Sequence, residues 1–204
     1  MDEAEAKRVR RLPPGPHGLP PELVERNQRE RLIAAMAEVC GERGYVEASV
    51  AEVSKRAGVS TASFYRQFKD KRECMLVSFE ELFWRLLEAI EGACPEGSDP
   101  PTRARVGAQT AAALLAGDLP TARLLSVEIL AVGPEGVRAQ HAAIERIAGL
   151  LGGTTRDGAA EVAGRHWAIA AAAVSLIARR VAEGGCPDAV ELEALIASKQ
   201  RPSV

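Results

Sequence analysis

Residues 49–71 read SVAEVSKRAGVSTASFYRQFKDK, and this stretch decides the fold. Ser49 is followed three residues later by Glu52, a spacing that is typical of a capping box and predicts a helix beginning after Ser49. Gly58 ends that helix, because glycine adopts the positive φ of a tight turn without steric cost. Ser60 then stands where it caps a second short helix. Two short capped helices joined by a small turn have the layout of a helix-turn-helix.

The two helices separate apolar from polar side chains. Four apolar residues are expected to pack on the inner face: Val50, Val53, Val59 and Phe64. The second helix is expected to present its other residues outward or toward its start: Thr61, Ala62, Ser63, Tyr65, Arg66 and Gln67. Small residues let a helix enter the major groove, which is roughly 12 Å wide, and hydroxyl groups there reach bases or phosphates. The alternative for Tyr65 is a core aromatic side chain.

Charge is distributed unevenly along the chain. The formal net charge of -2 excludes a uniformly basic coat for nucleic acid. Residues 54–72 nevertheless carry a cluster of basic side chains, against Asp70 as their single acidic one: Lys55, Arg56, Arg66, Lys69, Lys71 and Arg72. This cluster predicts a face that binds a polyanion, and the alternative is an ordinary solvated charged face.

The helical pattern extends beyond the motif. Apolar residues at three- and four-residue steps predict a helix from Glu22 that ends at Gly41 and Gly44, and Asp70 is placed to cap a long helix. Breaks rich in glycine and proline then predict helices near 101–116, 119–131, 134–151, 158–183 and 187–199. The sequence shows no strand-like alternation, so the fold class is predicted to be all-α.

A longer pattern carries a family resemblance. Its fixed positions are Val53, Ala57, Gly58, Val59, Ser60, Ser63, Phe64, Tyr65, Phe68 and Lys71. With these spacings, the pattern resembles the DNA-binding signature of the tetracycline-repressor (TetR) family, and the likeness covers roughly residues 26–79. The resemblance implies a bacterial, cytoplasmic transcriptional regulator, expected to be a repressor, that binds double-stranded operator DNA as a homodimer.

The same resemblance implies roles for single residues. Ser49 and Tyr65 are similar to phosphate-contacting positions, and Lys71 is similar to a lysine that anchors the DNA backbone. Positions that read base edges in the family correspond to Thr61, Ala62, Ser63 and Gln67. Ser60 and Arg66 complete the expected DNA-binding set. Three residues depart from the family's common choices and leave the operator sequence open: Ser54, Ser63 and Cys74.

Three segments are expected along the chain. Residues 1–21 are expected to form a flexible arm, in which a basic cluster precedes a proline-rich stretch: Lys7, Arg8, Arg10 and Arg11. This arm either reaches phosphates or the minor groove or is a tail without contacts. Residues 22–78 form the three-helix DNA-binding domain, with the motif at about 49–68. Residues 79–204 form the helical ligand-binding and dimerisation domain.

The resemblance also implies a ligand cavity and a dimer interface in the C-terminal domain. The expected cavity residues are Phe83, Trp84, Leu87, His141, Ile144 and Trp167. For the two tryptophans the alternative is core filling. The effector is expected to be small and largely apolar, because these helices offer few inward-facing charges. The alanine-rich stretch 166–182 allows close helix approach, so it and the last helix are expected to form the interface.

The sequence lacks the motifs that mark common enzymes and cofactor-binding proteins. The sequence has no nucleophile elbow, phosphate-binding loop or dinucleotide-binding glycine pattern, so neither an enzyme nor a cofactor is expected. An enzyme with an unrecognised site and an adaptor that binds no DNA remain the rival interpretations. His141 and Glu145 have a helical chelating spacing, but a third ligand would have to come from another helix, such as His166, so no metal is expected.

The cysteines and the hydropathy of the chain indicate the cellular compartment in which the protein is expected. Cys40, Cys74, Cys94 and Cys186 are scattered, which favours small buried side chains in a reducing cytoplasm, with a redox sensor as the alternative. The longest uncharged runs are well short of the roughly 20 apolar residues that cross a bilayer, so no membrane partner is expected.

Overall fold

The computed structural model describes residues 20–152 and 159–200, and these contain helices and no strand. The helices are α2 (Pro21–Glu47), α3 (Val50–Ala57), α4 (Thr61–Gln67), α5 (Lys71–Ala93), α6 (Pro100–Gly117), α7 (Leu119–Ser126), the 3-10 helix η1 (Glu128–Val132), α8 (Pro134–Gly152), α9 (Ala159–Ala182) and α10 (Ala189–Gln200). The predicted all-α class is confirmed. The basic cluster of the expected N-terminal arm lies outside the described residues.

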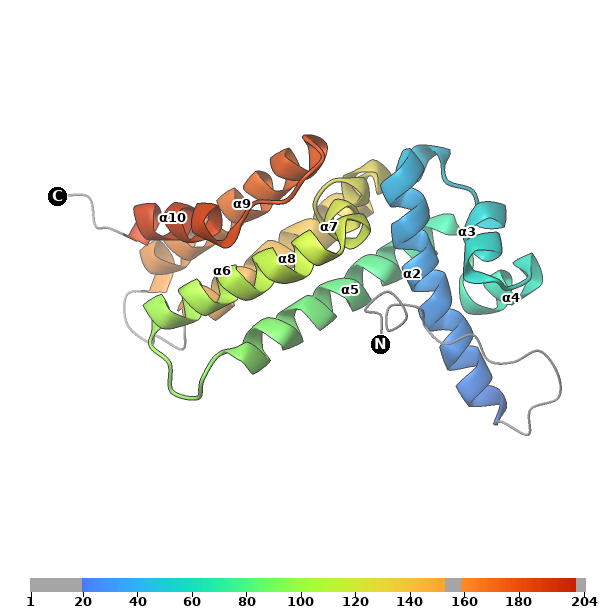
Figure 1. Ribbon diagram of the computed structural model, residues 1–204, viewed down its shortest axis with the longest axis horizontal. Helices are drawn as coiled ribbons and strands as arrows, with labels where there is room; N and C mark the ends of the chain where they lie inside the picture. Colours follow the sequence, from blue (N-terminus) through green and yellow to red (C-terminus); the bar gives the residue numbers. More distant parts are fainter. Residues whose placement is uncertain (1–19, 153–158, 201–204) are drawn as a thin grey trace.

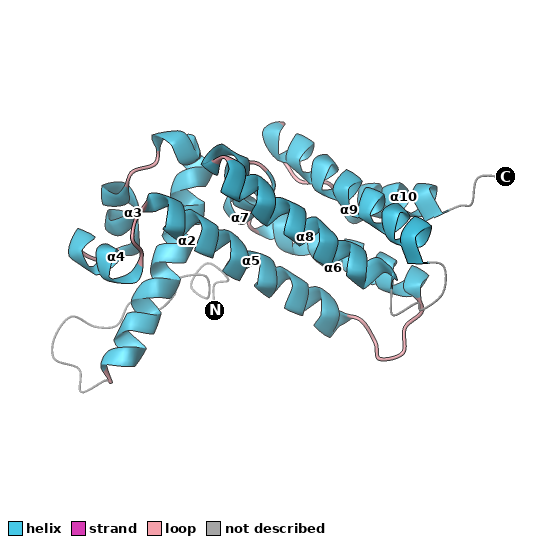
Figure 2. Cartoon of the chain, turned by 180° about the vertical axis from the view of Figure 1, so that it is seen from behind, coloured by secondary structure: helices cyan, strands magenta, loops and turns pink. Residues whose placement is uncertain are grey.

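The helices form two parts that share one long helix. Helices α2, α3 and α4 lie at one end of the molecule and helices α6 to α10 at the other, as Figures 1 and 2 show from opposite sides. Helix α5 starts beside α2 and runs along the second part, and α6 returns beside it in the opposite direction (Figure 1). A displacement of α5 would therefore move side chains that pack on it in both parts.

Two clusters of buried apolar side chains make up the core. The larger cluster draws side chains from α2, α4, α5 and η1, among them Leu32, Met36, Phe64, Phe79 and Ile129. The smaller cluster draws them from α6, α8, α9 and α10, among them Ala104, Ile144, Ile169 and Leu192. The larger cluster contains side chains from both parts of the molecule, so it joins the helix-turn-helix to the second part. Full burial of each large apolar side chain contributes about 1.5–3 kcal/mol to this packing.

The sequence predicted that helix α2 ends at Gly41 and Gly44, and the structure confirms the break at Gly44 but not at Gly41. The helix continues through Gly41, whose missing side chain lets Pro120 of α7 approach: a Cβ there would lie 3.1 Å from the Pro120 Cα. The break comes at Gly44, with φ 79° and ψ 157°, a conformation that is essentially restricted to glycine. One further turn then leads to α3.

The predicted helix 119–131 is also interrupted. Helix α7 ends at Ser126, and the chain changes to the 3-10 helix η1 after Val127. The change leaves Glu128 buried, with 6% of its surface exposed. Its carboxylate accepts hydrogen bonds from the Tyr45 backbone N–H at 2.7 Å and from Arg123 Nε at 2.9 Å. Glu128 therefore fastens η1 to the Gly44 break, directly before the helix-turn-helix.

Candidate nucleic-acid interface and ligand cavity

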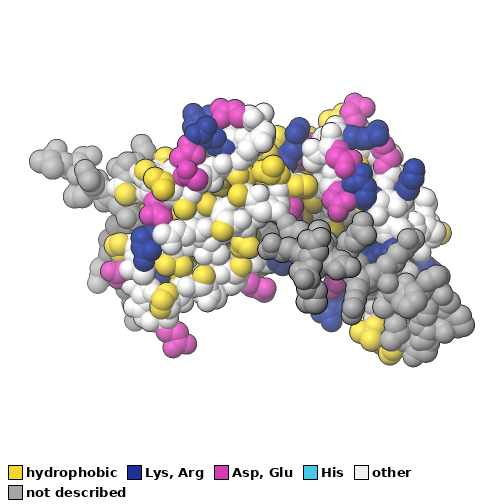
Figure 3. Space-filling view, viewed as in Figure 1, with side chains coloured by type: hydrophobic (Ala, Val, Ile, Leu, Met, Phe, Trp, Pro, Cys, Tyr) yellow, Lys and Arg dark blue, Asp and Glu magenta, His cyan; other side chains and the backbone are white. Residues whose placement is uncertain are grey.

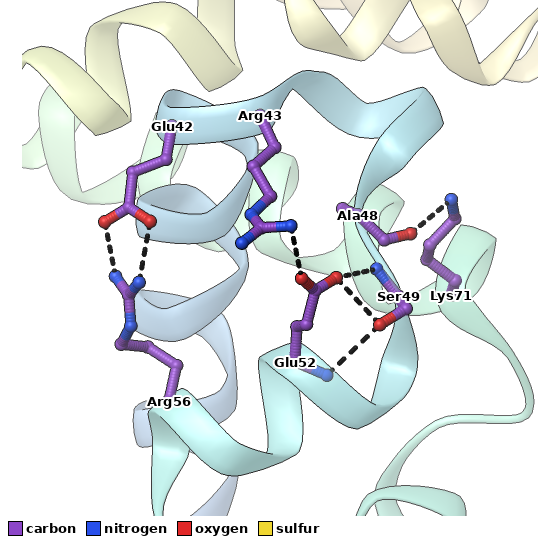
Figure 4. Close-up of polar contacts among 7 residues, drawn as sticks. All are labelled: Glu42, Arg43, Ala48, Ser49, Glu52, Arg56 and Lys71. Atoms are coloured by element: carbon purple, nitrogen blue, oxygen red, sulfur yellow. Dashed lines mark hydrogen bonds and ion pairs between the residues drawn. The ribbon is translucent and has the colours of Figure 1, made fainter.

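The helix-turn-helix is built by the local signals read from the sequence. Ser49 Oγ accepts the Glu52 N–H at 3.2 Å, and the Glu52 carboxylate accepts the Ser49 N–H at 3.1 Å, which completes the capping box (Figure 4). Gly58 has φ 64° and forms the turn. Ser60 caps α4 by accepting the Ser63 N–H at 3.0 Å. These three predictions are confirmed.

Helix α4 presents part of the expected set to solvent. Five of the residues are exposed: Ser60, Thr61, Ala62, Tyr65 and Arg66. Gln67 is half-buried, and its Nε2 donates to the Glu25 backbone oxygen at 3.4 Å. Tyr65 is 57% exposed, whereas Phe64 and Phe68 are buried, so the core-aromatic alternative for Tyr65 does not hold.

Ser63 lies on the inner side of α4 and is turned toward the helix start, which is one of the two orientations that the sequence predicted. Its side chain is 6% exposed. Its Oγ contacts Ser60 Oγ at 3.0 Å and accepts a hydrogen bond from Arg66 Nη2 at 2.8 Å. Ser63 therefore holds the start of α4 together and does not offer its hydroxyl to a base edge in this conformation.

Acidic residues of the neighbouring helices engage some of the basic cluster. Arg56 pairs with Glu38 and Glu42 at 3.0 and 2.7 Å, and Arg72 pairs with Glu135 at 3.2 Å. Figure 3 shows basic and acidic side chains interleaved at the end of the molecule formed by α2 and α3. Within the described chain, three basic side chains of the cluster are exposed and form no ion pair: Lys55, Arg66 and Lys69.

Lys71 is engaged with the protein itself. Its Nζ donates to the backbone oxygens of Tyr45, Val46 and Ala48 at 2.8, 3.2 and 2.7 Å, and lies 4.4 Å from the centroid of the Tyr45 ring. An ammonium group has three N–H donors, so these carbonyls use all of them. Lys71 therefore fixes the chain between α2 and α3, and Figure 4 shows its bond to Ala48.

Ser49 is engaged in the same way. Its hydroxyl donates to the Glu52 carboxylate at 2.8 Å, and Arg43 pairs with that carboxylate at 2.8 Å (Figure 4). The hydrogen bond from Ser49 is the main reason why the pKa of Glu52 is lowered. A phosphate contact by the Ser49 hydroxyl would have to replace its bond to Glu52.

The second part of the molecule contains an apolar cavity of about 230 Å³. Helices α5, α6, α8, α9 and α10 all contribute to its wall. Space is left because α6 lines it with small residues at helical spacing: Ala104, Gly107, Ala108 and Ala111. This run of small residues is the signal in the sequence that could have located the cavity.

Two of the six expected cavity residues line the cavity, namely Phe83 and Leu87. The other four do not border this cavity. Trp84 is 41% exposed and stacks against Arg146, whose Cζ lies 4.1 Å from the ring centroid. His141 and Trp167 contact each other on the surface, with ring centroids 5.5 Å apart.

Ile144, the last of these four, is buried in the smaller core cluster but does not reach the cavity. Helical periodicity locates an apolar face, whereas the packing of neighbouring helices decides which part of it borders a cavity.

Arg103 was missed by the sequence reasoning. Among the described residues that line the wall it is the one cationic side chain, and its Nε is buried without a hydrogen-bond partner. No sequence motif marks it, because its importance arises from the small residues that surround it in space.

The remaining candidate sites are structural or exposed. His141 Nδ1 lies 3.5 Å from the Glu145 carboxylate on the surface, and the described residues hold no group of three or more metal-ligating side chains. Burial raises the pKa of Cys40 and of Cys74 to about 12, so both thiols stay protonated at neutral pH. Among the described helices, none has the length and hydropathy to cross a membrane.

Known proteins resemble this chain in sequence and in fold. Residues 32–77 match the model of the family described as bacterial regulatory proteins, tetR family. The fatty acid metabolism regulator protein of Bacillus subtilis (strain 168) is 28% identical over 99 residues. These are 48% of this chain and 51% of the relative, so the match spans about half the length of that protein.

Solved structures share the fold over most of the chain. The fatty acid degradation regulator FadR of Bacillus halodurans has a TM-score of 0.69 at 20% identity, over 84% of this chain and 92% of that one. FadR of Bacillus subtilis in complex with stearoyl-CoA has a TM-score of 0.65 at 21% identity, over 83% and 96% of the two chains. Residues 32–77, which contain the helix-turn-helix, therefore match the tetR family of bacterial regulatory proteins, and the described chain as a whole shares the fold of the solved regulators.

Proposed function

We propose that the protein is a ligand-responsive transcriptional repressor. It binds a palindromic operator in double-stranded DNA as a homodimer and is released when a small, largely apolar molecule occupies the cavity. The observation that carries this proposal is the course of α5. The helix begins at Lys71, which bonds to the chain entering the helix-turn-helix, and its later residues Phe83 and Leu87 line the cavity.

A ligand in the cavity has to displace side chains along α5 or along the helices packed on it. Because the helix is stiff, a small shift near Leu87 moves Lys71 and with it the chain between α2 and α3. In a dimer, such a shift changes the spacing of the two recognition helices, which have to meet successive major grooves. Linkage of this kind typically amounts to about 1–3 kcal/mol.

The known relatives support an effector with an apolar part. The cavity wall is almost entirely apolar, and the similar FadR structure from Bacillus subtilis holds stearoyl-CoA. We therefore expect the effector to be a fatty-acyl compound and not a polar metabolite.

Selection of binding sites from random duplexes tests the DNA-binding half of the proposal. We expect inverted repeats with half-sites about 10 bp apart, because each exposed α4 reads only a few base pairs. Thr61→Val and Gln67→Ala are expected to change base preference at one or two positions of each half-site. Recovery of no enriched duplex, or unchanged preference in both variants, contradicts the proposed reading helix and favours an adaptor that binds no DNA.

The surface of α9 supports the proposal that α9 and α10 together form the interface between two copies of the chain. Small residues follow one face of α9 at steps of three and four, all of them exposed or half-buried: Gly164, Ala168, Ala171, Ser175, Ala178 and Ala182. A face of small side chains allows a second copy of the helix to approach closely, as the sequence predicted. The neighbouring α10 adds Val190, which is 73% exposed.

Replacing Ala168 with arginine is expected to convert the dimer into a monomer, because two guanidinium groups would meet across a two-fold interface. Sedimentation velocity measures the change, and operator affinity is expected to fall at least about tenfold with it. Ala113→Arg, on an exposed position of α6, is the matched control and should leave the dimer intact. A dimer that survives Ala168→Arg places the interface elsewhere.

A further inference from the structure

We propose that the cavity is selective for an anionic amphiphile, with a short apolar chain inside the cavity and the anionic head held by Arg103. This inference rests on the proposed effector function and gives the chemical class of the effector. The apolar wall alone requires no charge on the ligand, so a preference for an anion has to come from Arg103 and its surroundings.

Arg103 has an unfilled hydrogen-bonding position inside the protein. It lies one turn into α6, its side chain borders the cavity, and its Nε is buried without a partner. No described carboxylate forms an ion pair with it, although the pKa of Asp99 at the N-cap of α6 is lowered, mainly by a hydrogen bond from Thr102 and in part by the Arg103 charge. A buried donor without an acceptor is destabilising, and a charge-assisted bond from guanidinium to an oxyanion is among the stronger hydrogen bonds. A ligand that brings an oxyanion to this position therefore satisfies a group that the protein leaves unpaired.

The polar lining groups lie at one end of the cavity. Glu91 and Cys94 come from the end of α5, and Arg103 comes from the start of α6, which follows it in the chain. Glu91 is exposed, so water and ions screen its charge. This end lies far from α3 and α4 (Figure 1). The head group is thus placed at the far end of α5, and the apolar chain extends toward Phe83 and Leu115.

The volume of the cavity limits the length of that chain. A group the size of a water molecule takes about 30 Å³ in a condensed phase, so a cavity of about 230 Å³ holds roughly eight non-hydrogen atoms. A stearoyl chain, as in the similar structure from Bacillus subtilis, is longer than the part of a chain that this volume encloses. The geometry therefore fits an amphiphile with a chain of about eight carbons.

Calorimetric titration of the full chain with sodium octanoate and 1-octanol tests the proposal, since the two probes share the apolar chain and differ in head charge. We expect octanoate to bind about 10- to 100-fold more tightly than octanol. In Arg103→Met the ratio is expected to fall to about one, because methionine keeps an apolar stem of similar length and removes the donor. Arg105→Met, an exposed neighbour on the same helix, is the control and should retain the preference.

Two further measurements complete the design. Octanoyl-CoA distinguishes the sources of the anion. Tighter binding than octanoate that still depends on Arg103 assigns the anionic head to the phosphates of a coenzyme A moiety, and weaker binding assigns it to a free carboxylate. Ala108→Leu, which fills the cavity, is expected to abolish binding of all three probes. Equal binding of octanoate and octanol, an unchanged preference in Arg103→Met, or no binding of any probe overturns the proposal.

Operator release separates this inference from the proposed function. If octanol binds as tightly as octanoate and both release the operator, the apolar-effector function stands and the anion site fails. If octanoate binds through Arg103 and does not release the operator, the anion site stands and the effector function fails.

Discussion

Replacing Glu128 with alanine is expected to lower the free energy of unfolding by about 2–3 kcal/mol, because its buried carboxylate accepts charge-assisted hydrogen bonds from a backbone N–H and from the partly exposed Arg123. The variant leaves the Tyr45 N–H and the Arg123 guanidinium without their carboxylate, at the joint between η1 and the Gly44 break. Thermal or urea unfolding followed by circular dichroism measures the loss. Operator affinity is expected to fall as well, because this joint orients the chain that enters α3.

A graded series identifies the cause of the loss. Glu128→Gln keeps an acceptor for the Tyr45 N–H and removes the charge opposite Arg123, so its stability should lie between those of the wild type and Glu128→Ala. Glu135→Gln removes one member of an exposed pair with Arg72 and should cost less than about 1 kcal/mol. A cost below about 1 kcal/mol for Glu128→Ala would show that Glu128 does not fasten the two parts together.

Replacing Lys71 with methionine is expected to weaken binding to every duplex sequence alike, by about tenfold, which corresponds to about 1.4 kcal/mol. The three carbonyls between α2 and α3 lose their donor, so the free energy of unfolding should also fall by about 2–3 kcal/mol. Since the Lys71 donors are occupied within the protein, the slope of log affinity against log salt should not change. Fluorescence anisotropy at several salt concentrations measures both quantities.

Lys69→Met provides the contrast. Lys69 is exposed and forms no ion pair with a described residue. Its loss should reduce the salt slope by about one unit, as for a phosphate-contacting lysine, and leave thermal stability nearly unchanged. If Lys71→Met instead reduces the slope and leaves stability intact, Lys71 contacts a phosphate, as the family resemblance implies, and gives up its carbonyl partners when DNA binds.

The local architecture of the helix-turn-helix could be predicted from residue type and spacing. Ser49, Ser60 and Asp70 cap their helices through hydrogen bonds that span three residues, and Gly58 supplies the turn. Such contacts depend on neighbours along the chain, so residue type and spacing are sufficient to predict them. The later helices could be predicted for the same reason, because their amphipathic pattern also depends on spacing along the chain.

Which side chains are free to contact DNA or a ligand depends on how the helices pack, and this could not be predicted from local patterns. The Glu128 contact with Tyr45 and the Lys71 contact with Ala48 join residues that are 83 and 23 positions apart. The inward turn of Ser63 and the place of Arg103 in the cavity wall depend on how each helix is rotated against its neighbours. A helical period fixes the apolar face to within a residue or so, whereas a shift of one position moves a side chain by about 100° around the helix. The packing of all the helices together sets that rotation.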